Sequence, residues 1–147
     1  MIATRLRFYL DHLGLARAYI CSSYQLFPLF ISSPENAIFV INHENMHWVC
    51  LVKTNQHVTF FDPLGVDLVH YSEQLVDFIS GRLSYSHFIT LAKRVQSWNS
   101  KFCAKFCLFF LYNFCVLRRT VSQLEQDLQS MDSNDFIISS WLNHFHK

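Results

Sequence analysis

Two hydrophobic periods divide the chain into predicted helices and strands. Apolar residues recur three and four positions apart over residues 5–13, 71–83, 122–131 and 136–145, which is typical of amphipathic helices that bury one face. Shorter runs rich in β-branched and aromatic residues predict buried strands. These runs are Ala37–Asn42, His47–Thr54, His57–Asp62 and Phe88–Arg94.

Polar residues and glycine mark the connections between the strands. Residues 43–46 form a polar connection, the Asn55-Gln56 pair predicts a tight turn, and Pro63-Leu64-Gly65 ends the third run. We therefore expect the second and third runs to pair as a hairpin or meander.

Residues 21–33 are aromatic but show no clear period. Pro28 and Pro34 are expected to divide this part of the chain into turns and short extended pieces.

The most apolar stretch runs from Phe102 to Leu117, FCAKFCLFFLYNFCVL. It is shorter than the roughly 20 apolar residues that a membrane-spanning helix needs, and Lys105 and Asn113 interrupt it. A helix that is apolar nearly all round is expected in a protein core. We therefore predict a buried central helix, capped by Asn99 or Ser100, and no membrane segment.

These segments predict an α+β fold in a single domain that occupies residues 1–147. The expected order is an initial helix, an antiparallel or mixed central sheet, and helices arranged around the buried central helix. A chain of 147 residues suits one domain, and a hydrophobic fraction of 51% with 15 phenylalanines is enough to build its core.

Charge and cysteine content limit the classes of function. The net charge is +1 without a long basic run, so we do not expect nucleic acid to bind through bulk charge, although local DNA contact stays open. The five cysteines form no disulfide framework. The N-terminus lacks the apolar core and cleavage site of a signal peptide. We expect free thiols in an intracellular, reducing compartment.

Cys103 is the first candidate for chemistry because it lies near the start of the predicted central helix. The partial positive charge and free N–H groups of a helix N-terminus favour thiolate, which is the nucleophilic form of cysteine. The alternative is that Cys103 is a small apolar side chain of a buried helix.

His47 and Asp62 are candidates for a base and its orienting acid. They lie 15 positions apart, with the expected turn about midway, so the hairpin brings them to the same end of adjacent strands. A carboxylate there fixes the tautomer of the imidazole. The alternatives are a structural histidine and a carboxylate that only starts a turn.

Gln96 lies seven residues before Cys103 in a predicted polar loop. If the loop folds back, its amide donates to an oxyanion at the helix start; an exposed loop residue is the alternative. We predict no metal site, because the Cys103-x3-Cys107 pair lacks the two further ligands that a structural metal needs.

The order His47-Trp48, Asp62-Pro63-Leu64-Gly65, Gln96 and Cys103 resembles the adenovirus-type protease, adenain, and its wider group, which includes the SUMO-deconjugating proteases. The strongest similarity lies in VQSWNSKFCAKFCLFF, residues 95–110. This stretch resembles adenain's VQ pair, Asn-Ser loop, nucleophile and apolar helix, with the same glutamine-to-cysteine spacing of seven. The segment FPLFISSPENAIFVIN before His47 is also similar.

The resemblance implies an adenain-like α+β fold and a thiol protease. Cys103 is then the nucleophile, His47 the base and Asp62 the orienting acid, and Gln96 contributes to the oxyanion hole. Trp48 becomes a candidate substrate-binding residue at a narrow channel that admits small residues, with core packing as the alternative.

The chain departs from adenain at points that bear on mechanism. Ala104 replaces the glycine that follows the nucleophile, and Asp62 replaces a glutamate, as in the SUMO proteases. Residues 66–95 contain no cysteine, so a peptide cofactor attached there through a disulfide is not expected. The chemistry requires no cofactor, and activation by a peptide or by DNA stays open.

The resemblance also suggests substrates and rival functions. We expect cleavage of viral structural precursor proteins after small residues during virion maturation, in the host nucleus and the virion. A protease that removes ubiquitin or a ubiquitin-like modifier would use the same residues and remains an alternative. A catalytically inactive, protease-derived binding or scaffold protein is an alternative of another class, which the intact set of candidate residues argues against.

Overall fold

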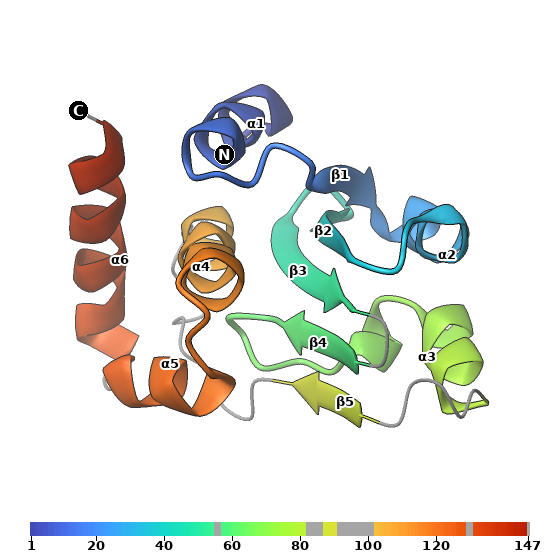
Figure 1. Ribbon diagram of the computed structural model, residues 1–147. Coiled ribbons are helices and arrows are strands. Elements are labelled where there is room, and N and C mark those ends of the chain that lie inside the picture. The colour runs from blue at the N-terminus through green and yellow to red at the C-terminus, as the bar shows by residue number, and fades with distance from the viewer. Residues whose placement is uncertain (55–56, 82–86, 91–101, 129–130, 147) are drawn as a thin grey trace.

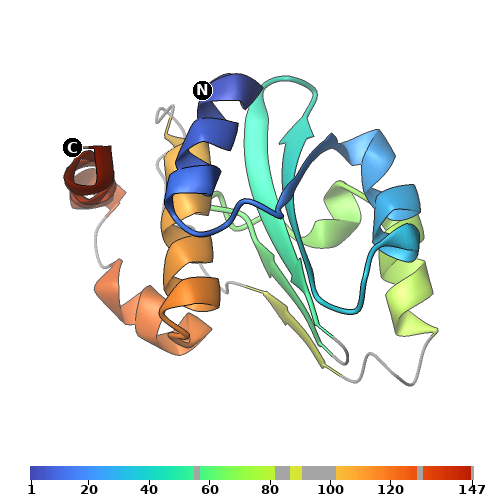
Figure 2. The same cartoon turned by 45° about the horizontal axis from the view of Figure 1, so that its top comes forward.

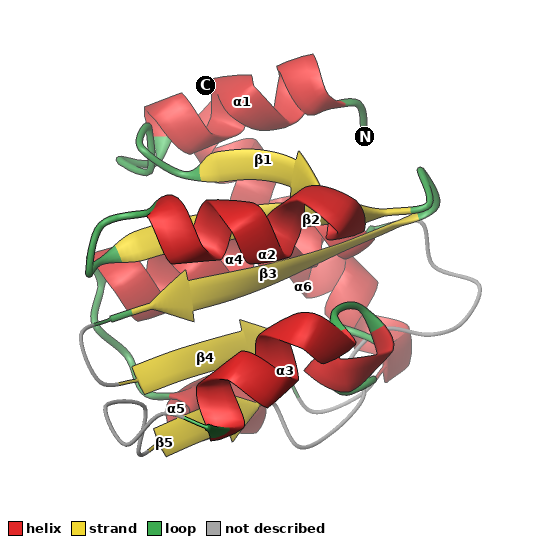
Figure 3. Ribbon diagram, turned by 90° about the vertical axis from the view of Figure 1, so that its right-hand side faces the viewer, coloured by secondary structure: helices red, strands yellow, loops and turns green. Residues whose placement is uncertain are grey.

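A five-stranded mixed sheet forms the centre of the molecule (Figures 1 and 3). The computed structural model describes residues 1–54, 57–81, 87–90, 102–128 and 131–146. The strands are β1 (Tyr19–Ser22), β2 (Ala37–His43), β3 (His47–Lys53), β4 (His57–Phe61) and β5 (His87–Thr90). The helical elements are α1 (Ala3–His12), α2 (Ser23–Ser32), the 3-10 turn η1 (Leu68–His70), α3 (Glu73–Ser80), α4 (Cys103–Leu111), the π-helix η2 (Tyr112–Val116), α5 (Val121–Asp127) and α6 (Met131–His146).

The strands lie in the order β1-β2-β3-β4-β5. β2, β3 and β4 pair antiparallel, as the predicted meander requires, whereas β1 is parallel to β2 and β5 is parallel to β4. The prediction of an α+β fold with a mixed sheet is confirmed. The predicted Asn55-Gln56 turn and the end of the predicted strand 88–94 lie outside the described residues.

Helices cover both faces of the sheet (Figure 2). α2 and α3 lie on one face, and α1 and α4 lie on the other, with α6 packed on the outer side of α4. Successive side chains of β3 point to opposite faces of the sheet, so this strand contributes to the hydrophobic core on each face. Trp48 and Cys50 belong to the core on the α4 side, while Val49 and Leu51 belong to the core on the α2 side.

The predicted central helix begins at Cys103 and is buried nearly all round. Every residue of α4 except Lys105 is buried. Its N-cap residue is Phe102, which makes no side-chain cap bond, so the prediction of a cap at Asn99 or Ser100 is wrong. Packing against β3 and α6 therefore places the start of α4. Among the described residues, none of the helices is both long and apolar enough to cross a membrane.

Residues 21–33 do not form turns and short extended pieces, as the prolines had suggested. Ser22 ends β1 and caps α2 in a reciprocal capping box with Gln25. Pro28 lies inside the helix, and the carbonyl that it leaves without a helical donor belongs to Tyr24, whose side chain is 88% exposed. The burial of Leu26 and Phe30 on one helical face outweighs the lost hydrogen bond.

A buried lysine terminates α2 and supplies a stability test. The Lys53 ammonium donates to the carbonyls of Phe30 at 2.7 Å and Ser33 at 3.2 Å, and to the Ser33 hydroxyl at 3.0 Å. These carbonyls at the end of α2 have no helical donor of their own.

We expect Lys53→Met to lower the free energy of unfolding by about 1–3 kcal/mol, because the methionine fills the space but makes none of the three hydrogen bonds of Lys53. The Ser33 carbonyl then loses this donor, and the Phe30 carbonyl keeps the Ser33 hydroxyl at 2.8 Å. Urea unfolding followed by circular dichroism measures the change. Arg17→Met, at an exposed position, is the matched control. Equal unfolding midpoints for the two variants would contradict the assigned role of Lys53.

Candidate active site

Three candidate residues from distant parts of the chain meet at one end of the sheet. His47 is the first residue of β3, Asp62 directly follows β4, and Cys103 is the first residue of α4. Because β3 and β4 run antiparallel, the start of one lies beside the end of the other. α4 packs across β3 and brings its N-terminus to the same place.

Asp62 is a buried carboxylate held by three donors. Its Oδ1 accepts from His47 Nε2 at 2.7 Å and from the backbone N–H of Leu64 at 2.9 Å. Its Oδ2 accepts from the Tyr71 hydroxyl at 2.5 Å. Asp62 is 2% exposed, so this arrangement fixes both the carboxylate and the imidazole.

The Cys103 thiol lies against the backbone of the residue after His47. The Trp48 N–H donates to Cys103 Sγ at 3.4 Å. Burial alone would raise the pKa of Cys103, but the hydrogen bond from His47, the Trp48 and Ala104 N–H groups and the charge of His47 lower it below its usual value. The site therefore favours thiolate.

The pKa of His47 is raised, whereas that of Cys103 is lowered. Burial lowers the pKa of His47, but hydrogen bonds to Asp62 and Cys103 and the charges of both partners outweigh burial and raise it to about 9. Since Nε2 faces Asp62, Nδ1 is the ring nitrogen left for the thiol. Together the two shifts favour a thiolate–imidazolium pair over the neutral thiol and imidazole.

In three other cysteines the pKa of the thiol is raised, whereas that of Cys103 is lowered. Burial raises the pKa of Cys21 to about 11 and that of Cys115 to about 12. Burial and a hydrogen bond with Cys50 raise the pKa of Cys107 well above its usual value. These thiols are protonated side chains of the core, whereas Cys103 is placed for chemistry.

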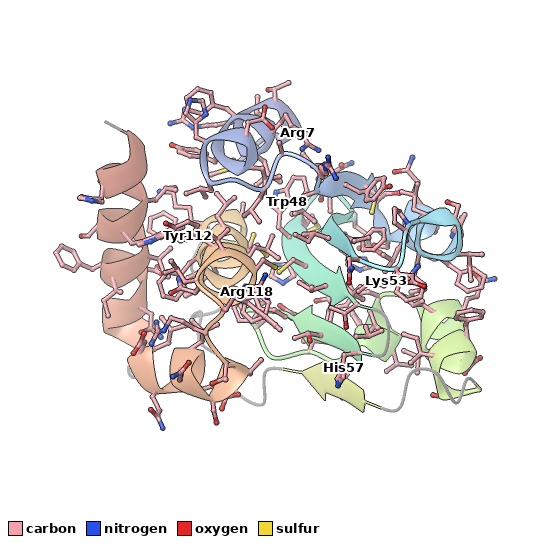
Figure 4. The ribbon with its side chains drawn as sticks, viewed as in Figure 1. Arg7, Trp48, Lys53, His57, Tyr112 and Arg118 are labelled. Atoms are coloured by element: carbon pink, nitrogen blue, oxygen red, sulfur yellow. The ribbon has the colours of Figure 1, made fainter. Side chains whose placement is uncertain are left out.

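Trp48 is more enclosed than a substrate-channel residue would suggest. Its side chain is 5% exposed and belongs to the core on the α4 side, between α1, α4 and the sheet (Figure 4). The indole Nε1 donates to the carbonyl of Met1 at 3.1 Å. The N-terminal residue therefore covers this edge of Trp48.

Two residues of the site were missed by sequence reasoning. Tyr71 was treated as the first residue of a helix, and no local pattern marks it as the partner of Asp62. Asn42 lies directly opposite Trp48 in the β2–β3 pair, so the two side chains share one face. Its Oδ1 is buried and has no hydrogen-bond partner among the residues that the structure describes, which is uncommon in folded proteins.

Gln96 lies outside the described residues, so its oxyanion role stays a prediction. Among the described residues, His, Cys, Asp and Glu form no group of three or more that is placed to hold a metal ion.

Two solved structures with a similar fold are proteases. The chain is similar to the ASFV pS273R protease, with a TM-score of 0.60 and 8% identity over 90% of this chain and 63% of that chain. It is also similar to the C-terminal Ulp1 protease domain, solved in complex with Smt3, the yeast orthologue of SUMO, with a TM-score of 0.50 and 10% identity over 82% of this chain and 67% of that chain. By sequence, no protein-family model and no curated protein matches the chain.

At these identities the similarity establishes the fold, which is that of the SUMO-protease-like cysteine proteases. The predicted group is thus supported, and adenain is not singled out within it. The chain spans less than two thirds of the ASFV protease.

The pH dependence of alkylation tests the proposed thiolate. We expect iodoacetamide to label Cys103 at mildly acidic pH, because its lowered pKa keeps thiolate present there. Labelling of Cys21, whose pKa is about 11, should fall about tenfold for each pH unit below that value. Mass spectrometry locates and times each adduct.

His47→Ala is the decisive comparison for this measurement, since it leaves the burial of Cys103 in place. We expect the labelling profile of Cys103 to move to higher pH when the imidazolium is lost. An unchanged profile would contradict the ion pair.

Tyr71→Phe tests how strongly the carboxylate is held. The ring is kept and one hydrogen bond to a buried charge is lost, so we expect unfolding free energy to fall by about 1.5–3 kcal/mol. Tyr24→Phe, at a position 88% exposed, is the control and should unfold like wild type. Equal midpoints for both variants would show that the Tyr71 hydroxyl contributes nothing to the carboxylate.

Proposed function

We propose that the chain is a cysteine peptidase that cleaves protein substrates by acyl transfer at Cys103. The observation that carries the proposal is the contact of His47 with both Asp62 and Cys103, together with the lowered pKa of that thiol. Such a polarised pair, buried and oriented by a third group, is what nucleophilic catalysis requires. The SUMO-protease-like fold supports the same reading.

The proposed reaction has two halves. Cys103 Sγ attacks the scissile carbonyl carbon, and a carbon–sulfur bond forms while the carbonyl oxygen becomes an oxyanion. Collapse of this intermediate breaks the carbon–nitrogen bond, and the His47 imidazolium donates its proton to the leaving amine. Water, deprotonated by His47, then attacks the thioester, which releases the acid and the Cys103 thiol.

The oxyanion requires donors at the helix start. The backbone N–H of Cys103 is available, because the first N–H groups of a helix have no intrahelical acceptor. Gln96 is the predicted second donor, and this part of the proposal rests on sequence alone.

Asn42 is proposed to align the substrate chain. Its buried, unpartnered Oδ1 lies on the face of the sheet that carries Trp48, and Trp48 in turn contacts the nucleophile through its N–H. A backbone N–H of an extended substrate would satisfy this acceptor once Met1 moves away from the indole.

We propose protein precursors cut after a small residue as the substrates, with viral structural precursors as the first candidate and the virion or host nucleus as the place of action. This substrate class follows the resemblance to adenain. Removal of a ubiquitin-like modifier is the second candidate, and the similarity to Ulp1, whose structure is a complex with a SUMO orthologue, favours testing it. Activation by a peptide or by DNA stays a prediction.

Variants of the three central residues test the activity. We expect Cys103→Ala to lose cleavage of fluorogenic Gly-Gly peptides and of coumarin-linked ubiquitin and SUMO, by about 10⁴-fold or more, because the nucleophile is gone. Cys115→Ala, which removes a thiol whose pKa is raised, should retain wild-type rates. Asp62→Asn should lose less activity than Cys103→Ala or His47→Ala.

Retained cleavage in Cys103→Ala would overturn the assignment of the nucleophile. A wild-type rate in Asp62→Asn would remove Asp62 from the mechanism. If wild type cleaves neither kind of substrate while Cys103 still labels as a thiolate, the result supports an activated thiol at Cys103. It contradicts the proposed substrate class.

A further inference from the structure

A large cleft lies at the opposite end of the sheet from the candidate active site. Its volume is about 1540 Å³, and the ends of β1, β2 and β3 line it together with η2 and α5. β3 begins at His47 and reaches the cleft at Val52 and Lys53. At about 3.3 Å per residue, the cleft is roughly 20 Å from His47 along this strand.

The cleft combines an apolar wall with a cationic rim. Ile38, Val52 and Phe114 contribute apolar side chains to it. Four cationic residues and two acidic residues also line it: Arg17, Lys53, Arg118, Arg119, Glu35 and Glu125.

Two of these cationic side chains already have hydrogen-bond partners within the protein. Lys53 donates to the end of α2. Arg119 bonds Asn113 Oδ1 at 3.2 Å and Asp127 at 2.5 Å. Neither charge needs a ligand.

Arg17 and Arg118 are different. Both are exposed, and within the described part of the chain neither guanidinium has a hydrogen-bond or ion-pair partner. The Arg17 segment is nevertheless held in place, because Arg7 donates to the carbonyl of Ala16 at 2.9 Å and to that of Ala18 at 2.6 Å. Arg17 is therefore presented from a fixed backbone.

The backbone at Arg118 points to a role for its side chain. Arg118 has φ 57°, a left-handed conformation at a helix end where glycine is strongly favoured. It follows the π-helix η2, a rare geometry that is frequent at functional sites. Figure 4 shows Arg118 beside the end of α4. The chain thus bears backbone strain here while presenting an unpaired guanidinium to the cleft.

We propose that this distal cleft binds an acidic peptide segment of a protein partner, with carboxylates on Arg17 and Arg118 and an apolar side chain against Ile38, Val52 and Phe114. Charge complementarity favours the acidic segment, since four cationic residues and two carboxylates line the cleft, and the guanidiniums of Arg17 and Arg118 offer the fork geometry that suits carboxylates. The volume exceeds the roughly 300–1,000 Å³ of small-molecule pockets and suits a peptide. The proposal holds whether or not the chain is a peptidase.

Fluorescence polarisation with a defined probe tests the cleft. The probe is a fluorescein-labelled hexapeptide of four aspartates, one phenylalanine and one leucine, and its control has asparagines in place of the aspartates. The protein is the full chain carrying Cys103→Ala, so cleavage cannot consume the probe. We expect at least tenfold tighter binding of the acidic peptide, weakened by added salt.

Arg118→Gly separates a binding role from a structural one. Glycine relieves the left-handed backbone, so the thermal midpoint should rise while affinity for the acidic peptide falls at least fivefold. Arg17→Ala should weaken binding similarly, and Arg5→Ala, which removes an exposed charge outside the cleft, should not.

Equal affinity for the acidic and neutral peptides would overturn the proposal. Wild-type affinity in the Arg17→Ala/Arg118→Gly double variant would also overturn it. Cleavage assays on the chain with Cys103 intact report separately on the peptidase, so either proposal can fail alone.

Discussion

The packing of α4 between the sheet and α6 is the constraint on which the candidate site depends. α4 is apolar on nearly every side, so it has no exposed face around which it could rotate at low cost. Its first residue is consequently held against the backbone of β3, where the Trp48 N–H reaches the sulfur. Hydrophobic packing thus places Cys103, the proposed nucleophile, next to a polar strand end.

The charged part of the site is a buried arrangement whose carboxylate, Asp62, accepts three hydrogen bonds. Burial opposes ionisation of the thiol, and the pair forms because the imidazole, two backbone N–H groups and the carboxylate behind the imidazole compensate for the lost hydration. Tyr71 and Leu64 complete the set by donating to Asp62. Each of these donors comes from a segment just after β4, so the turn at 63–65 and η1 serve the site as much as the strands do.

The strands β2 to β5, the central helix and the proximity of His47 and Asp62 were predictable, because they follow from periodicity and from the geometry of a hairpin. β1 was not predicted as a strand. The two parallel pairings were not, since nothing local indicates that β1 and β5 join the edges of the meander. α2 was missed because Pro28 is a strong local signal for a break, whereas the packing of Leu26 and Phe30 that overrides it is a tertiary effect. Tyr71 was missed for the same reason: a tyrosine at a helix start has no distinguishing neighbour in sequence, and its partner is chosen by the fold.

The order in which the site residues occur in the chain has a consequence for synthesis. His47 and Asp62 leave the ribosome well before Cys103, and α4 must then dock on strands that are already paired. The sheet closes through contacts between distant segments, which form slowly. In a nascent or partly folded chain Cys103 therefore lacks the neighbours that lower its pKa, and it meets them only when α4 has docked. The order of the elements in the chain therefore delays activation of the Cys103 thiol until the surrounding domain has folded.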